Sequence, residues 1–176
     1  NAVNDVPIAE NISINIEEDE SIVIQLVGFD VDAGTTLTYE VVSSASNGTL
    51  SVDGGLVTYA PNVNYNGLDS FSYQVNDGSL ASNIATVNIS IESINDVPMI
   101  ISSASTQATE DIEYEYQVVV EDPDNDSFEF VLDNAPDGMI VSSDGLITWT
   151  PLEGVTTSGL VTLTVSDGDL AVIEEF

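Results

Sequence analysis

VTYAPNVNYNGLDSFSYQVNDG, residues 57–78, contains the pattern that decides the fold. Apolar side chains alternate with polar ones at Phe71, Tyr73 and Val75. The same period of two runs through residues 12–16, 22–26, 37–41, 87–91, 112–120 and 160–165. Such alternation is typical of strands buried on one face, and Asn-Gly or Asp-Gly pairs separate the runs as turns. No segment has a sustained helical period, so the sequence predicts an all-β chain.

The chain repeats itself once. The recurring stretches are NDVP (4–7 and 95–98), GLVTYAP and GLITWTP (55–61 and 145–151), and VNDG and VSDG (75–78 and 165–168). A period of about 90 residues is a whole domain rather than a solenoid unit. We therefore expect two tandem immunoglobulin/cadherin-like Greek-key β-sandwiches, at 4–94 and 95–176, with a hinge at the second NDVP stretch.

The second domain is expected to have a truncated closing strand. Fewer residues follow Gly168 than separate its counterpart, Gly78, from the next domain. The closing strand would then be limited to 171–176. We expect the neighbouring strand, around 160–165, to keep unpaired backbone groups at an edge.

The charge is wholly one-sided. The 176 residues include 31 Asp and Glu and no Lys, Arg or His, which gives a formal net charge of −31. Clustered carboxylates repel one another by roughly 1–4 kcal/mol per close pair, so the counter-charge must come from outside the protein. Oxygen-only ligands favour Ca²⁺. The alternative is a generally acidic, soluble surface.

The same composition excludes several functions. Nucleic acid and anionic membranes require basic partners. Without His, Cys or Lys the usual activators of a nucleophile are absent, so we expect no enzyme. There are no cysteines for disulfides. The sequence shows neither a signal peptide nor an apolar run long enough to span a membrane, and we expect it to be a fragment of a larger protein.

The chain resembles the bacterial cadherin-like repeats of very large surface and secreted adhesins. The first repeat is similar to the tandem type in NGTL (47–50), VTYAPNVNYNGLDSFSYQVNDG (57–78) and INDVP (94–98). The second is similar to the dystroglycan type, or an Ig domain, in APDGMIVSSDGLITWTP (135–151) and VTLTVSDG (161–168). The resemblance implies an extracellular or bacterial cell-surface location and Ca²⁺ at domain junctions.

The resemblance also implies the calcium ligands. At the junction these are Glu18, Asp69, Asn95, Asp96, Asp122, Asp124 and Asp167. An equivalent half-site at the start of the first repeat would use Asn4, Asp5, Asp30, Asp32 and Asp77, with its other ligands on an upstream domain. Ser70-Phe71 replaces the expected Arg-Glu and the linker is short, so we expect fewer ions per junction.

Asp126 completes an Asp-x-Asp-x-Asp run with Asp122 and Asp124. An EF-hand is not expected, because Ser127 stands where that loop needs Gly and Asp133 where it needs Glu. A calcium site in a sandwich loop fits better. An Asx-rich turn without a ligand remains the alternative.

Three functions fit these features. The leading one is a calcium-rigidified spacer or adhesion module that contacts its neighbouring tandem domains. The second is a calcium-dependent carbohydrate-binding module, for which Trp149 and Tyr65 are the candidate sugar-stacking residues, although core packing suits Trp149 better. The third is homotypic adhesion to like domains on another cell.

Overall fold

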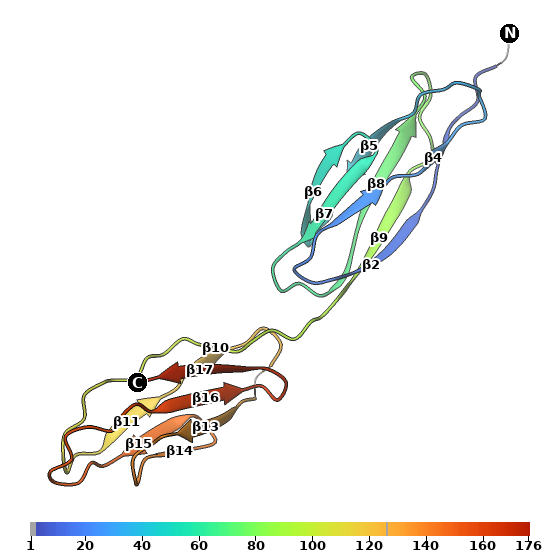
Figure 1. The fold of residues 1–176 in the computed structure, drawn as a ribbon. Coiled ribbons are helices and arrows are strands. Elements are labelled where there is room, and N and C mark those ends of the chain that lie inside the picture. The colour runs from blue at the N-terminus through green and yellow to red at the C-terminus, as the bar shows by residue number, and fades with distance from the viewer. Residues whose placement is uncertain (1–2, 126) are drawn as a thin grey trace. The chain divides into compact units, whose positions relative to one another are not determined.

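The computed structural model describes residues 3–125 and 127–176, and this part of the chain consists of strands and loops only (Figure 1). It therefore contains no helix that could cross a membrane. Contacts divide the chain into two compact units, Asn1–Ile94 and Asn95–Phe176. The all-β expectation is confirmed.

The first unit is a sandwich of two main sheets. One sheet has the order β2-β9-β8-β5, formed by Ile12–Glu17, Ala85–Glu92, Gly67–Asn76 and Thr38–Ser43. The other has the order β3-β7-β6, formed by Ile22–Gln25, Leu56–Pro61 and Gly48–Asp53. A short pair joins β1 (Ile8–Ala9) to β4 (Gly28–Phe29). Pairing is antiparallel except between β2 and β9, which run parallel.

The predicted alternation builds the core between these sheets. Phe71, Tyr73 and Val75 point inward from β8 and are almost fully buried, as is Tyr59 from β7. A buried tyrosine needs a partner for its hydroxyl, and that of Tyr73 donates to the carbonyl of Glu10 at 2.6 Å.

The second unit repeats this plan with shorter strands. One sheet has the order β11-β15-β14, formed by Tyr114–Gln117, Leu146–Trp149 and Ile140–Val141. The other has the order β13-β16-β17, formed by Glu129–Asp133, Thr162–Ser166 and Ala171–Glu175. The pair β10 (Met99–Ile100) and β12 (Val120–Glu121) corresponds to β1 and β4. Ile147, Leu163 and Val165 lie at the centre of its core.

The expectation of unpaired backbone groups at 160–165 is wrong for most of that stretch. All of β16 pairs with β17, and Val161 and Phe176 exchange two backbone hydrogen bonds of 2.9 and 3.1 Å. Strand structure is missing instead at 155–160, which precede the pairing, and at 102–113, where the first unit has β2.

Candidate functional site

A hairpin turn holds the first residue of the NDVP stretch in each unit. In the first unit, Asp77 Oδ1 accepts the N–H of Leu80 at 2.7 Å, while its Oδ2 accepts Nδ2 of Asn4 at 2.8 Å. In the second unit, Asp167 does the same with Leu170 at 2.7 Å and Asn95 at 2.8 Å. Each aspartate thus caps its own turn and fixes the incoming chain.

An Asp-x-Asp loop holds the next residue in the same way. The N–H of Asp5 donates to Oδ2 of Asp32 at 2.8 Å, and the N–H of Asp32 donates to Oδ1 of Asp30 at 2.7 Å. The counterparts in the second unit are Asp96 to Asp124 at 2.8 Å and Asp124 to Asp122 at 2.8 Å. We call each set an Asx pole: Asn4, Asp5, Asp30, Asp32 and Asp77 in the first unit, and Asn95, Asp96, Asp122, Asp124 and Asp167 in the second.

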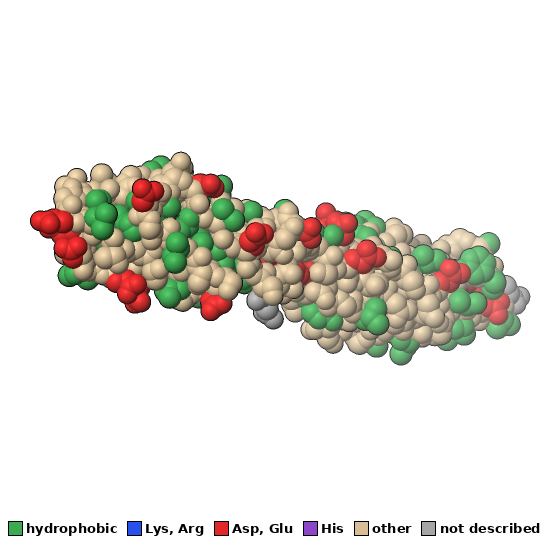
Figure 2. Space-filling model, turned by 90° about the horizontal axis from the view of Figure 1, so that it is seen from below, with side chains coloured by type: hydrophobic (Ala, Val, Ile, Leu, Met, Phe, Trp, Pro, Cys, Tyr) green, Lys and Arg blue, Asp and Glu red, His purple; other side chains and the backbone are tan. Residues whose placement is uncertain are grey.

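The Asx poles carry negative charge that no basic side chain offsets. Figure 2 shows acidic side chains scattered over the face in view and no basic ones, as the composition requires. The N–H of Leu80 and the Asn4 amide lower the pKa of Asp77. The Asn95 amide and the N–H of Leu170 lower the pKa of Asp167. These donors keep both carboxylates ionised.

Each Asx pole also encloses a carboxylate oxygen that has no hydrogen-bond partner in the described residues. The atoms are Oδ2 of Asp30 and Oδ2 of Asp122. A buried charged oxygen without a donor is unfavourable by more than the 1–3 kcal/mol of a neutral group. Both poles therefore contain the same enclosed carboxylate oxygen, which a hydrogen-bond donor or a cation could contact.

Glu18 stands at the other end of the first unit, just after β2. Its side chain is only 5% exposed. Oε1 accepts the N–H of Ile94 at 2.8 Å, whereas Oε2 has no hydrogen-bond partner in the described residues. Glu18 therefore has a buried carboxylate oxygen without a hydrogen-bond partner in the described residues, as Asp30 and Asp122 do in the Asx poles.

Asp69, in contrast, is fully engaged inside the first unit. Oδ1 accepts the N–H groups of Ser46 and Ser70, at 3.0 and 2.8 Å, and Oδ2 accepts the N–H of Asn47 and the hydroxyl of Tyr59, both at 2.9 Å. Burial alone would raise the pKa of Asp69, but these donors outweigh it and lower the pKa. This role went unnoticed in the sequence, although the alternation through residues 69–75 places Asp69 on the inward face.

The two aromatic side chains proposed for sugar stacking serve the core instead. Trp149 is 7% exposed and pairs across the sheet with Tyr114. Tyr65 packs against the first core, where its hydroxyl accepts from Asn47 and donates to the carbonyl of Leu68, both at 2.9 Å. Neither ring therefore stands out as an exposed platform, because Trp149 is buried and Tyr65 packs against the core.

Asn125 contacts the second Asx pole, which the sequence did not indicate. Its amide donates to Oδ1 of Asn95 at 2.8 Å, and its N–H donates to Asp122 at 2.9 Å. The repeat gave no signal for it, because Ala33 stands at the corresponding position. Asp126, the third acid of the run, lies outside the described residues.

Within residues 3–125 and 127–176, no three acidic side chains converge closely enough to form a complete metal site. Each Asx pole instead brings its carboxylates together through backbone N–H groups. Such a pole could supply part of a coordination shell. Ca²⁺ takes six to eight oxygens, so water, carbonyl groups or another module would have to supply the rest.

Solved structures of cadherin ectodomains share the fold. The human desmocollin-1 ectodomain matches 96% of this chain and 39% of its own, with a TM-score of 0.57 and 13% identity. Cadherin domains 1–4 of protocadherin gamma B7 match 97% of this chain and 48% of their own, with a TM-score of 0.55 and 21% identity. At these identities the likeness establishes the fold alone.

Two curated relatives match part of the sequence. Protein GAMETE EXPRESSED 2 of Arabidopsis thaliana is 35% identical over 107 residues, which is 60% of this chain and 12% of that protein. Integrin beta-like protein A of Dictyostelium discoideum is 32% identical over 111 residues, which is 54% of this chain and 6% of that protein. The chain thus spans a small part of either relative.

Both repeats match the same family, at residues 4–90 and 95–174. Domains of this kind are typical of extracellular or surface proteins. The match agrees with the two sandwiches, the repeated Asx poles and the likeness to cadherin ectodomains. The chain therefore belongs to the bacterial Ig domain family, and it carries two of these domains in tandem.

Proposed function

We propose that the two domains are calcium-binding, calcium-rigidified spacer or adhesion modules of a large bacterial surface or secreted protein, with no enzymatic activity. The observation that carries this proposal is the repeated Asx pole. Oδ2 of Asp30 and Oδ2 of Asp122 have no hydrogen-bond partner among the described residues, and the chain has no basic side chain. Under this proposal, the first domain is a cadherin-like repeat of the tandem type and the second is one of the dystroglycan type.

The donor set suits a hard cation. In the second unit, carboxylate oxygens of Asp122, Asp124, Asp96 and Asp167 would hold the ion, with the Asn95 side chain beside them. The first Asx pole offers the matching five residues. Glu18 would provide a ligand from the end of a preceding module, because its Oε2 is buried and has no partner in the described residues. Asp69 is left out of this set, since it is only 8% exposed and each of its oxygens already accepts two hydrogen bonds from protein donors.

Calcium would act electrostatically. With ions absent, carboxylates on adjoining modules repel one another. With ions bound, ligands from both modules would share them, which would limit the motion of the hinge. Extracellular calcium modules bind at about 10⁻⁴–10⁻³ M, which fits a millimolar calcium environment.

Thermal unfolding in EDTA and in calcium tests the proposal. A ligand that binds only the folded state adds RT ln(1 + [L]/Kd), about 2.7 kcal/mol per site at a hundredfold excess. Trp149, the single tryptophan, reports the second unit. We expect CaCl₂ to raise its midpoint, and Asp122→Asn to remove most of that rise.

Asp137→Asn is the matched control, because Asp137 lies in an exposed turn and belongs to neither Asx pole. It should respond to calcium like the wild type. If the wild-type midpoints in EDTA and in calcium are equal at matched ionic strength, the chain does not bind calcium.

The rigidifying effect has a separate test. Asp96→Ala or Asp124→Ala should broaden the distribution of interdomain distances, measured by small-angle scattering in calcium, more than it lowers the midpoint of either unit. If wild-type and variant profiles coincide, any ion belongs to one domain only.

Homotypic adhesion remains a prediction, which sedimentation in calcium over a range of protein concentrations would check. Calcium-dependent carbohydrate binding, or another polysaccharide partner, loses its candidate platform, because Trp149 and Tyr65 are packed in the cores.

A further inference from the structure

A ribbon of two short strands, β1 and β4, lies against the first sandwich. The strands pair antiparallel, with Ile8 opposite Phe29 and Ala9 opposite Gly28. Ala9 is buried in the core, whereas Ile8 and Phe29 are 53% and 57% exposed. Directly opposite residues of an antiparallel pair point to the same face. The ribbon therefore has one face against the core and one face in solvent.

The solvent face of this ribbon is apolar. The alternation that places Ile8 and Phe29 outward also leaves Val6 and Val31 exposed on one side of that pair, and Val27 on the other. We call these five side chains the apolar ribbon face. Apolar side chains that are exposed singly are normal, but a contiguous exposed group is typical of an interaction site.

Hydrogen bonds hold the two chain segments together beyond the paired residues. At one end, the N–H of Asp5 donates to Oδ2 of Asp32 at 2.8 Å. At the other end, the N–H of Glu10 donates to the carbonyl of Val27 at 3.2 Å. The apolar ribbon face is therefore one continuous strip rather than a set of unrelated side chains.

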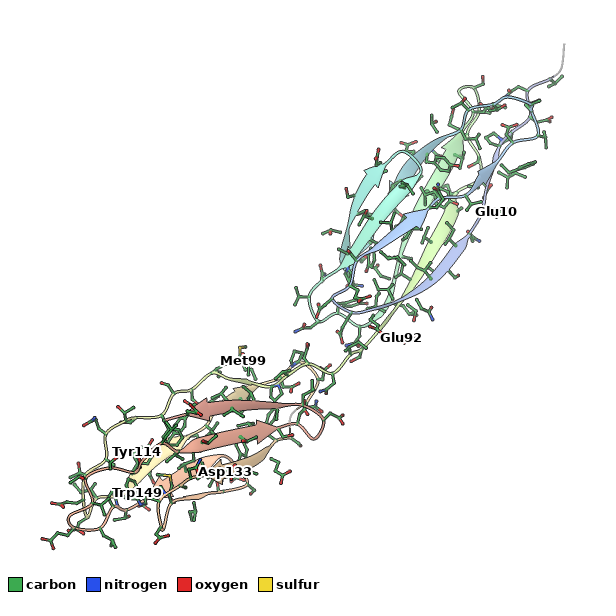
Figure 3. All side chains as sticks on the ribbon, in the orientation of Figure 1. Glu10, Glu92, Met99, Tyr114, Asp133 and Trp149 are labelled. Atoms are coloured by element: carbon green, nitrogen blue, oxygen red, sulfur yellow. The ribbon has the colours of Figure 1, made fainter. Side chains whose placement is uncertain are left out.

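The second unit has a counterpart that is interrupted at its centre. Met99, Ile101 and Val119 are exposed there, and Figure 3 labels Met99 in β10. Met99 pairs with Glu121, so a carboxylate stands where the first unit has Phe29. Only the first of the two ribbons thus has an unbroken apolar face.

The charges around the apolar ribbon face indicate what kind of partner fits it. Glu10, labelled in Figure 3, is exposed and continues the outward alternation of β1 beyond Ile8. The Asx pole of the first unit, with its carboxylates, begins beside Val6 and Val31. The chain has no Lys, Arg or His, so a second copy would bring only more carboxylates to this surface, and like charges across an interface oppose binding. The complementary partner combines apolar side chains with basic ones.

We propose that the apolar ribbon face binds an extended polypeptide segment of another protein, in which apolar side chains at alternate positions are flanked by Lys or Arg. Outward side chains of a strand repeat about every 7 Å, which is also the repeat of alternate side chains in an extended segment. Apolar side chains of the partner would pack on Ile8 and Phe29, and a basic one would reach Glu10. This assignment rests on the proposed adhesion role, but it does not require calcium.

Fluorescence anisotropy of a labelled peptide tests the proposal, with the full chain in EDTA and 0.15 M salt. The probe KSISVSVSK has apolar residues at alternate positions and a lysine at each end, so that either direction along the ribbon places one near Glu10. One control, KSSIVVSSK, has the same composition without the alternation. The other, ESISVSVSE, replaces both lysines. We expect KSISVSVSK to bind about tenfold more tightly than either control.

Substitutions in the apolar ribbon face locate the binding. Phe29→Ala should weaken the binding of KSISVSVSK about tenfold, and Phe29→Glu, which copies the charge pattern of the second ribbon, should abolish it. Leu68→Ala is the matched control, because Leu68 is an exposed apolar residue of β8 outside this face, and it should bind like the wild type. Glu10→Gln should weaken binding and reduce its dependence on salt.

Two results would overturn the assignment directly: equal binding of the three peptides, or equal affinity of wild type and Phe29→Ala for KSISVSVSK. Sedimentation addresses the other possible occupant. If the wild-type chain associates with itself and Phe29→Ala removes that association, the face belongs to a second copy, and the proposal is wrong. Since the peptide measurements are made in EDTA, a chain that does not bind calcium would fail the thermal test above without changing them.

Discussion

Removing the Asp69 carboxylate should destabilise the first unit more than any calcium effect does. Asp69→Ala leaves four donors without their acceptor: the N–H groups of Ser46, Asn47 and Ser70 and the hydroxyl of Tyr59. A hydrogen bond to a charged group contributes about 1.5–3 kcal/mol. Water can replace part of this at the edge of the site, so we expect a loss of about 4 kcal/mol. Asp69→Asn keeps one acceptor oxygen and should lose about 2 kcal/mol.

Differential scanning calorimetry is the assay, because it resolves two transitions and tryptophan fluorescence identifies the one that belongs to the second unit. Asp53→Ala is the matched control, since Asp53 is the exposed last residue of β6, and it should change stability by no more than about 0.5 kcal/mol. The loss from Asp69→Ala should be the same in EDTA and in calcium.

The pH dependence has a definite sign. Because the folded-state pKa of Asp69 is lowered, the unfolded chain takes up the proton first as the pH falls. The stabilisation is fully present above the unfolded pKa of about 3.9 and is lost as the pH falls through the folded pKa. A loss smaller than 1 kcal/mol, or one that appears only in calcium, would refute the structural role of Asp69.

Three further predictions concern other sites. Gly145→Ala should destabilise the second unit by about 1–3 kcal/mol, because Gly145 has φ of +77° and a Cβ there would stand 2.9 Å from Phe130. Gly138→Ala, in the same unit, has positive φ but no neighbour within 4 Å, and it should cost less in a melt followed by the fluorescence of Trp149. Burial and Glu174 raise the pKa of Tyr116 to about 12, so the stability that its neutral form confers should be present below pH 10 and lost between about pH 10 and 12, and Tyr116→Phe should flatten that limb of an alkaline titration. Glu18→Gln should leave stability in EDTA unchanged or higher, since it neutralises a buried carboxylate whose Oε2 has no hydrogen-bond partner among the described residues, but should weaken calcium binding in a calorimetric titration.

Alternation was sufficient to predict most of the fold. Strands β8 and β9 each have one buried face and one exposed face. Apolar residues that recur with a period of two can all lie on one face only in a strand. The resemblance to cadherin-like repeats named the ten residues that the structure gathers into the two Asx poles, and their role as calcium ligands stays a prediction.

The remaining features depend on contacts that no local pattern encodes. Asn125 joins its pole through a side chain that has no counterpart in the first repeat. The absence of strand structure at 155–160 was likewise not indicated by any pattern in the residues there. Asp69 is the instructive case, because its inward position was readable from the alternation, and an inward carboxylate must have donors inside the protein.

The linker between the domains leaves almost no slack. Ile94 donates its N–H to Glu18 of the first unit, and the next residue, Asn95, is bonded through its side chain to Asp167 of the second. Two adjacent residues are thus fastened to different bodies, and only the few backbone torsions around one peptide bond lie between them. Such a connection behaves as a joint rather than as a tether. An array built from this repeat would gain little contour length from its junctions when pulled, and its early resistance to force would come from reorienting whole domains.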